Sequence, residues 1–209
     1  MSGSRSRPIL ALRRQSDRAV HDLGEKVAIA LTGIGEFFRT YAPVVEDYLG
    51  VRRGERETLG GFLDWYRAVV ERKVDGLTLE DAKRVRTPTG MSALGILKHL
   101  GWVERGWFRE TFAGEDVEAI DLEGDNSAEF AIGTDDTVES VIAFYRAEVE
   151  EARHIVRDSP SLDALSARET SYGERVSLRW ILVHMLEETA RHGGHLDLMR
   201  EEIDGQVGD

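Results

Sequence analysis

The sequence predicts an all-α protein, a four-helix bundle preceded by an N-terminal helical extension. Three observations predict this class. Four long segments repeat apolar residues at the 3.6-residue spacing of one helix face. The connections between these segments are short to medium in length, and almost no segment alternates apolar and polar residues as a strand does. We expect the extension to span residues 1–54 and the bundle to span residues 55–209.

The extension differs in character from the rest of the chain. Its first 18 residues contain five arginines and a single aspartate. Apolar residues then recur at helical spacing between Val20 and Tyr41, which predicts one amphipathic helix. Such a helix needs a partner surface, either on the bundle or on another subunit. A membrane-surface role is disfavoured, because the polar face mixes both charges and is not rich in lysine.

The bundle helices follow in order. The first begins near Arg56 and ends at Gly76, and a short helical turn follows at 78–84. Ser92 is placed to cap a second helix over 93–112. A third helix is expected from about Thr137 to residue 156. The last begins after a capping serine at 177 and reaches residue 203, before a terminating glycine.

The connection over 113–136 holds nine acidic residues and no lysine or arginine. This composition predicts a solvated loop. Within it, residues 127–133, SAEFAIG, could pair as a brief strand.

Composition excludes several classes of function. The chain has no cysteine, so disulfides, thiolate metal sites and a cysteine nucleophile are ruled out. The net charge of −12 argues against a nucleic-acid binder, which needs a basic surface. No apolar run approaches the roughly 18 residues of a membrane span. The apolar stretch near the N-terminus is too short for a signal peptide, so we expect a cytoplasmic protein.

The segment HMLEETARHGGHLDLMRE, residues 184–201, contains three of the six histidines. With His184 as reference and about 100° per residue, Glu188 lies at about 40°, His192 at about 80° and His195 at about 20°. The apolar residues of this helix fall between about 60° and 120° on the same scale. Four polar groups therefore lie on or beside the apolar stripe, where an unpartnered carboxylate is costly. A metal ion, a hydrogen-bond network or a wet cavity would offset that cost.

His99 borders the buried face of the second helix, so it could meet Glu188 and His192 across the bundle. These three residues are the candidate metal ligands. Three protein ligands leave a coordination position for water or substrate, as in catalytic zinc-type sites. His184 and His195 would then orient the ligands or move protons. Imidazole and carboxylate ligands suit Zn, Ni, Fe or Mn.

The segments TPTGMSALGILKHLGWVERGWF and VSLRWILVHMLEETARHGGHLDLMREEIDG resemble the DinB-like superfamily, in a branch of uncharacterised proteins. The resemblance covers about residues 55–208. It implies a four-helix bundle, a divalent metal held by His99, Glu188 and His192, and often a homodimer. Members such as the mycothiol-dependent maleylpyruvate isomerase are similar in having a glutamate at the position of Glu188. Gly193, Gly194 and His195 replace the Arg-Gly-Gln of other members, so no substrate is implied.

The leading hypothesis is a metal-dependent thiol transferase or isomerase of the mycothiol or bacillithiol kind, acting on a small molecule. The metal would activate a low-molecular-weight thiol or a water molecule. His195 or His184 would carry the proton as catalytic residues. Trp102, Trp107 and Trp180 are candidates for the walls of the pocket.

Two alternatives stay open. In the first, the bundle is non-catalytic: a structural metal joins two helices, and the protein acts through dimerisation or through a partner that binds the extension. In the second, no metal binds, and Glu188 belongs to a buried polar network with Arg191 or Arg105.

Overall fold

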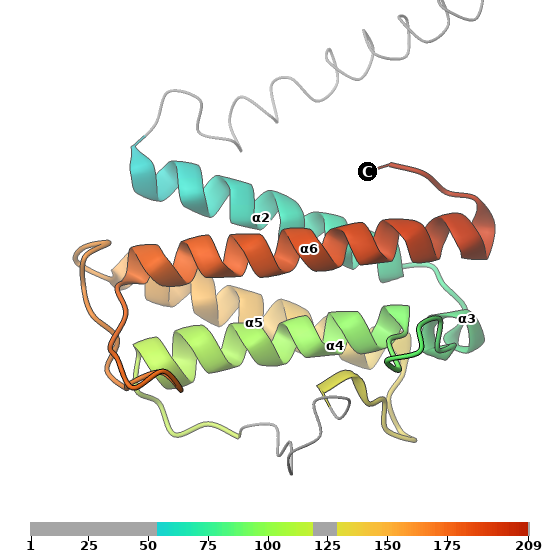
Figure 1. Ribbon diagram of the computed structural model, residues 1–209, viewed down its shortest axis with the longest axis horizontal. Coiled ribbons are helices and arrows are strands. Elements are labelled where there is room, and N and C mark those ends of the chain that lie inside the picture. Colours follow the sequence, from blue (N-terminus) through green and yellow to red (C-terminus); the bar gives the residue numbers. More distant parts are fainter. Residues whose placement is uncertain (1–53, 119–128, 209) are drawn as a thin grey trace, which may run out of the picture. The chain divides into compact units, whose positions relative to one another are not determined.

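A computed structural model describes residues 54–118 and 129–208. Within these ranges the chain is helical and has no strand, which confirms the all-α prediction. The elements are α2 (Glu55–Val74), α3 (Leu79–Lys83), α4 (Ala93–Glu104), η1 (Arg105–Phe112), α5 (Val138–Asp158) and α6 (Leu178–Asp204) (Figure 1). The helix expected between Val20 and Tyr41 lies outside the described residues. None of the described helices is long and apolar enough to cross a membrane.

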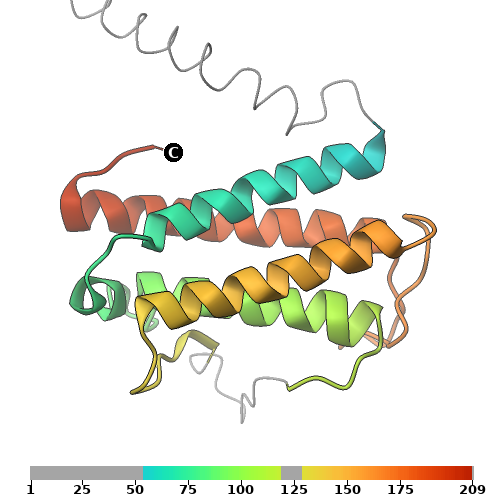
Figure 2. The ribbon, with the colours of Figure 1, turned by 180° about the vertical axis from the view of Figure 1, so that it is seen from behind.

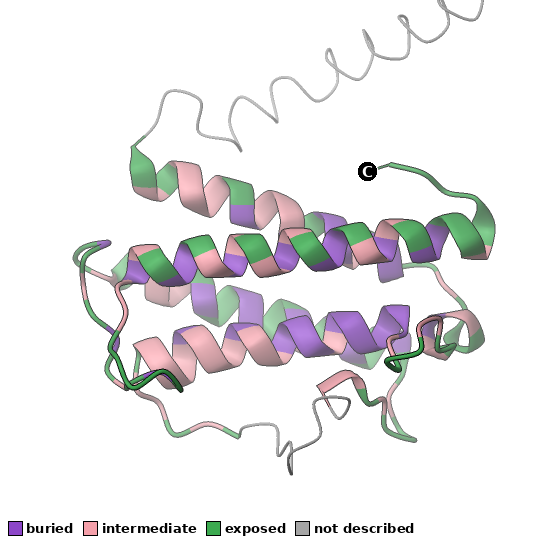
Figure 3. Ribbon diagram, viewed as in Figure 1, coloured by how far each residue is buried: buried purple, intermediate pink, exposed green. Residues whose placement is uncertain are grey.

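The four long helices pack as two pairs. Helix α2 lies along α6, and α4 lies along α5. Helices α4 and α6 form the face seen in Figure 1, whereas α2 and α5 form the face seen from behind in Figure 2. Helices α2, α5 and α6 each bury one stripe and expose the opposite one (Figure 3), as expected for amphipathic helices, whereas α4 is buried or half-buried along its whole length.

The buried apolar residues form two clusters along the bundle. One contains Leu97, Leu100 and Leu196, and the other contains Leu63 and Met185. On α6 the two clusters are separated by residues 186–195, and on α4 and η1 by residues 101–107. The middle of the bundle is therefore a polar layer between two apolar cores, and the candidate ligands of α6 lie in it.

A buried ion pair crosses this layer between α2 and α4. Arg67 donates through Nε to Glu104 Oε1 at 2.7 Å and through Nη2 to Oε2 at 2.6 Å. The side chains are 5% and 1% exposed. Sliding α2 along α4 would separate the two charges, and a buried charge without a partner is strongly destabilising. The two-point contact therefore fixes the register of α2 against α4.

The helix starts match the capping residues of the sequence. The Ser92 hydroxyl accepts from the Gly95 amide at 3.1 Å, and the Ser177 hydroxyl accepts from the Trp180 amide at 3.2 Å. Thr137 and Ser140 form a reciprocal capping box at the start of α5. Gly205, with φ of 74°, ends α6 in the left-handed conformation that glycine adopts without strain.

The helix expected over 93–112 differs from prediction in its second half. From Arg105 onward it is a π-helix, and its last turn closes with the Ala113 amide bonded to the Phe108 carbonyl at 2.9 Å. The wider turn changes the direction of every side chain after Glu104 relative to a continuous α-helix. An ideal α-helix continued beyond Glu104 would therefore give the wrong direction for the Trp107 side chain.

The predicted strand at 127–133 is wrong for its described part. Residues 129–130 form a short helical turn and residues 131–133 have no regular structure. The Phe130 ring packs against the first apolar cluster and lies 4.6 Å from the His99 ring. Burying one aromatic side chain on α4 explains why this part of the loop folds onto the bundle instead of pairing as a strand.

Candidate metal centre

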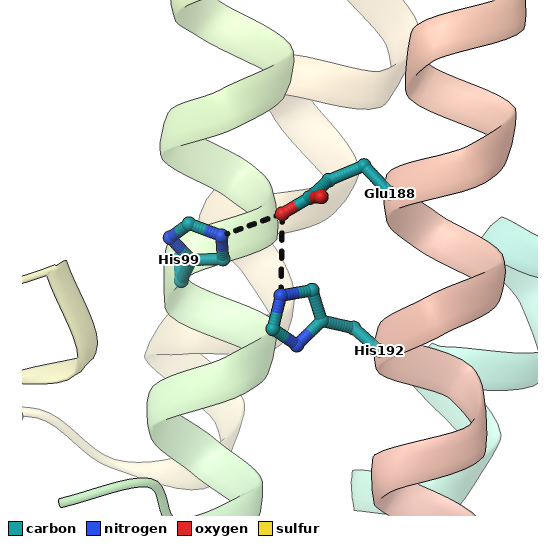
Figure 4. Close-up of side chains that lie close together, drawn as sticks. All are labelled: His99, Glu188 and His192. Carbon is teal, nitrogen blue, oxygen red and sulfur yellow. Dashed lines mark hydrogen bonds and ion pairs between the residues drawn. The ribbon is translucent and has the colours of Figure 1, made fainter. Parts of the chain in front are cut away.

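Three predicted ligands meet between α4 and α6 (Figure 4). Glu188 Oε1 lies 3.2 Å from His99 Nε2 and 3.2 Å from His192 Nε2. One ligand atom from each residue lies within 4.8 Å of the other two. Among residues 54–118 and 129–208, no other group of three or more His, Asp or Glu side chains converges in this way. We call these three residues the trio.

Helix geometry explains the arrangement. Glu188 and His192 are four residues apart on α6, so they project from the same side of one rigid element. His99 lies near the middle of α4, and Figure 4 shows its ring directed across the gap toward both. Two ligands from one helix and one from its neighbour thus converge without any loop contribution.

The carboxylate of Glu188 is well partnered. Hydrogen bonds from His192 and then His99 hold the pKa of Glu188 far below its ordinary value, against the opposing effect of burial. Arg191 adds a long contact, with Nη1 3.5 Å from Oε2, but this exposed arginine also binds Glu187. Arg105 does not reach Glu188. It pairs with Glu148 at 2.7 Å, so that version of the metal-free alternative is wrong.

The donor set fits a divalent cation. Two imidazole nitrogens and one carboxylate oxygen are ligands of catalytic zinc-type sites, which keep a fourth position for water or substrate. Bonds of about 2.1 Å in a tetrahedron separate neighbouring ligand atoms by about 3.4 Å. The two 3.2 Å separations around Glu188 Oε1 are close to that value. The residues could therefore hold an ion with small adjustments of the side chains.

Each histidine of the trio has a neighbour at its second ring nitrogen. Glu129 Oε2 lies 3.2 Å from His99 Nδ1, although this nitrogen has no aligned hydrogen bond. His195 Nδ1 lies 3.4 Å from His192 Nδ1. Groups at this position orient ligating imidazoles and tune their basicity. Glu129 is a site residue that the sequence analysis missed, because it lies in a segment expected to be solvated.

The position of Glu129 depends on a close backbone approach. A Cβ atom on Gly95 would lie only 2.5 Å from the carbonyl oxygen of Phe130. Glycine at 95, one turn before His99, therefore lets the 129–130 turn lie directly on α4. The sequence signal that could have located this contact is the glycine on the buried face of the helix, together with an aromatic residue in an acidic loop.

The other two predicted histidines lie in different surroundings. His195 contacts the trio through His192, with ring centroids 5.1 Å apart. Burial lowers the pKa of His195, and the positive charges of His192 and Arg191 add to this effect. His184 instead stacks on Trp180 at 5.1 Å and meets Trp107 edge-on at 4.7 Å.

The three candidate wall tryptophans separate into two groups. Trp107 and Trp180 contact each other, with ring centroids 5.3 Å apart, and enclose His184 one turn before Glu188. Trp102 packs against Phe144 of α5 and under the guanidinium of Arg105. Trp107 and Trp180 are therefore neighbours of His184, whereas Trp102 lies toward α5.

Comparison with known protein families gives a match over most of the chain. A family model described as mycothiol-S-transferase matches residues 58–205, which include every helix from α4 to α6 and all three members of the trio. No curated protein matches the sequence.

Proposed function

The chain belongs to the mycothiol-S-transferase family, and on this premise we propose that it is a divalent-metal-dependent transferase of a low-molecular-weight thiol. The proposed reaction joins the thiol sulfur to an electrophilic carbon of a small molecule. Isomerisation by addition and later loss of the thiol is the related reaction that the same site would support. The observation that carries the proposal is the convergence of His99, Glu188 and His192 within the matched region.

The proposed transfer needs three events. The thiol proton passes to a base, the sulfur forms a bond to carbon, and the leaving group departs with the electron pair of its broken bond. A divalent ion bound by the trio would supply a lowered thiol pKa, so that thiolate is available near neutral pH. The chain itself supplies the ligand atoms, and Glu129 and His195 would hold the two imidazoles in position.

His195 is the stronger candidate for the base. Its Nδ1 lies 3.4 Å from His192 Nδ1, so its imidazole is directly beside a ligand of the trio, where a proton acceptor is needed. No hydrogen bond or ion pair joins His184 to the trio in the described structure. We keep His184 as a second candidate, because it lies one helical turn from Glu188 with Trp107 and Trp180 beside it.

Metal analysis of purified protein is the first test. We expect close to one divalent ion per chain in wild type and none in His99→Ala. The matched control is His154→Ala, which removes an exposed histidine paired with Glu150 on α5. If wild type binds no stoichiometric metal after incubation with Zn, Ni, Fe or Mn salts, the proposal fails and the metal-free polar network is favoured.

The same variants separate a catalytic from a structural metal. Loss of metal in His99→Ala with a melting temperature close to wild type favours an open functional site. Loss of metal together with unfolding favours a structural role, the rival function. The activity itself is measured as metal-dependent consumption of mycothiol with an activated aryl chloride, in which a C–S bond forms and chloride leaves. Absence of any metal-dependent rate would contradict the transferase proposal.

The remaining parts of the proposal concern partners and location. We propose a homodimer in the cytoplasm that takes a small-molecule substrate and no nucleic acid. Light scattering coupled to size-exclusion chromatography tests the dimer, and cell fractionation tests the location. The identity of the metal follows from competition between Zn, Ni, Fe and Mn for the trio.

A further inference from the structure

A cavity lies on the other side of the bundle from the trio, between α2 and α5. It encloses about 660 Å³ and is lined only by residues of these two helices. They form the face seen in Figure 2, whereas the trio lies between α4 and α6 on the face seen in Figure 1. A volume between about 300 and 1,000 Å³ is typical of small-molecule sites. We call this cavity the α2–α5 groove.

Arginines outnumber carboxylates among the residues that line the groove, although the chain has a net charge of −12. Its lining contains four arginines and two glutamates, namely Arg67, Arg72, Arg146, Arg153, Glu71 and Glu150. Arginine presents several donors in a planar fork that matches carboxylate and phosphate oxygens. A concave site with such donors on both walls is suited to an oxyanion.

One buried hydroxyl beneath the groove has no partner. The Tyr145 side chain is 1% exposed, and its hydroxyl makes no hydrogen bond among the described residues. The hydroxyl oxygen is closed to solvent, so it does not reach a ligand bound in the groove. The donors available to a ligand are therefore the arginines of the rim.

The arginines of the rim can accept a ligand at low cost. Arg72 has no ion pair or hydrogen bond with any described residue. Arg146 uses only Nη2, bonded to Glu71 at 2.6 Å, and is 61% exposed. Arg153 pairs with Asp64 and Glu150 on the surface. Exposed pairs of this kind contribute little to stability, so their guanidiniums are free to exchange one carboxylate for another.

We propose that the α2–α5 groove binds a small molecule through its carboxylate or phosphate group, at a site separate from the trio. Arg72 and Arg146 bind the oxyanion from the two walls of the groove. Arg67 does not bind the ligand directly, since Glu104 and Asp64 occupy its donors. Its role is to keep the floor rigid beneath the tyrosine.

Calorimetric titration of the full chain tests the proposal, with inorganic phosphate and succinate as probes in buffers of equal ionic strength. We expect saturable binding of at least one probe, with one site per chain. Arg72→Gln and Arg146→Gln should each weaken binding about tenfold or more, since each removes a charged donor to the oxyanion. Arg157→Gln is the matched control, because this exposed arginine of α5 lies outside the groove and pairs with Asp158.

The two probes distinguish the two kinds of ligand: tighter binding of inorganic phosphate indicates a phosphate ligand, and tighter binding of succinate indicates a carboxylate ligand. Melting curves check that Arg72→Gln and Arg146→Gln stay folded, as expected for exposed arginines. His99→Ala should bind the probe as wild type does. The proposal is overturned if neither probe binds saturably, if the folded arginine variants bind as tightly as wild type, or if His99→Ala abolishes binding.

Discussion

Glu129 should contribute to metal affinity although it does not touch the ion. Its carboxylate lies 3.2 Å from His99 Nδ1, the ring nitrogen that faces away from Glu188. Removing a group at this position costs about 10–100-fold in metal affinity in comparable sites. Because the contact is not an aligned hydrogen bond and Glu129 is 27% exposed, we expect the lower end, about tenfold. This corresponds to about 1.4 kcal/mol of binding free energy.

The perturbation is Glu129→Ala, with Glu129→Gln beside it. Glutamine keeps an oxygen acceptor for the imidazole N–H but loses the negative charge, so its affinity should fall between wild type and Glu129→Ala. The assay is competition for Zn²⁺ or Ni²⁺ against a chromophoric chelator of known affinity. Asp135→Asn is the control for general loss of negative charge, because Asp135 is exposed on the same connection.

Two results would refute the reasoning about Glu129. Affinity of Glu129→Ala within twofold of wild type would mean that the carboxylate does not orient His99. An equal loss in Asp135→Asn would mean that long-range attraction of the cation, and not contact with the imidazole, explains the effect.

Three further outcomes are expected. Gly95→Ala should weaken metal binding several-fold, because its Cβ would lie 2.5 Å from the Phe130 carbonyl oxygen and displace the 129–130 turn. The control is Gly60→Ala, whose Cβ meets nothing within 4 Å. This control should raise the free energy of unfolding by up to about 1 kcal/mol and leave the metal affinity unchanged. Glu104→Gln should lower the free energy of unfolding in urea by about 3 kcal/mol, since the Nε and Nη2 donors of the buried Arg67 lose their charged partner and only Nη1 keeps one, Asp64; a loss under about 1 kcal/mol would contradict this account. The metal-free protein should lose stability in EDTA as the pH falls below about 4.3, the ordinary glutamate value, because the folded pKa of Glu188 is depressed by His192 and His99. Glu188→Gln should remove this part of the dependence of the unfolding free energy on pH, and an unchanged dependence would refute the assignment to Glu188.

The centre was predictable where it depends on local geometry. Glu188 and His192 are four residues apart, and any α-helix places such a pair on one side. Placing His99 against them needed one further step, that the buried faces of two helices in a bundle meet. The capping residues Ser92 and Ser177 were equally accessible, because a cap involves only the three residues that follow it.

The features that were missed depend on contacts between distant segments. The partner of Arg105 was expected to be Glu188 in one alternative, yet it is Glu148 on α5. Helix periodicity determines which side of its own helix a residue occupies, but not which of two neighbouring helices its long side chain reaches. The π-helix at Arg105–Phe112 was also missed, because the spacing of apolar residues does not reveal its wider turn.

The sequence by itself therefore determined the helices, their buried faces and the three residues of the candidate centre, because these follow from periodicity, capping and residue chemistry within one or two elements. Only the tertiary structure decided that Glu129 lies against His99, that His184 lies among tryptophans, and that arginines and an unpaired tyrosine line the α2–α5 groove. The physical reason is that these contacts join residues far apart in the chain, and their geometry depends on how two helices or a helix and a loop pack.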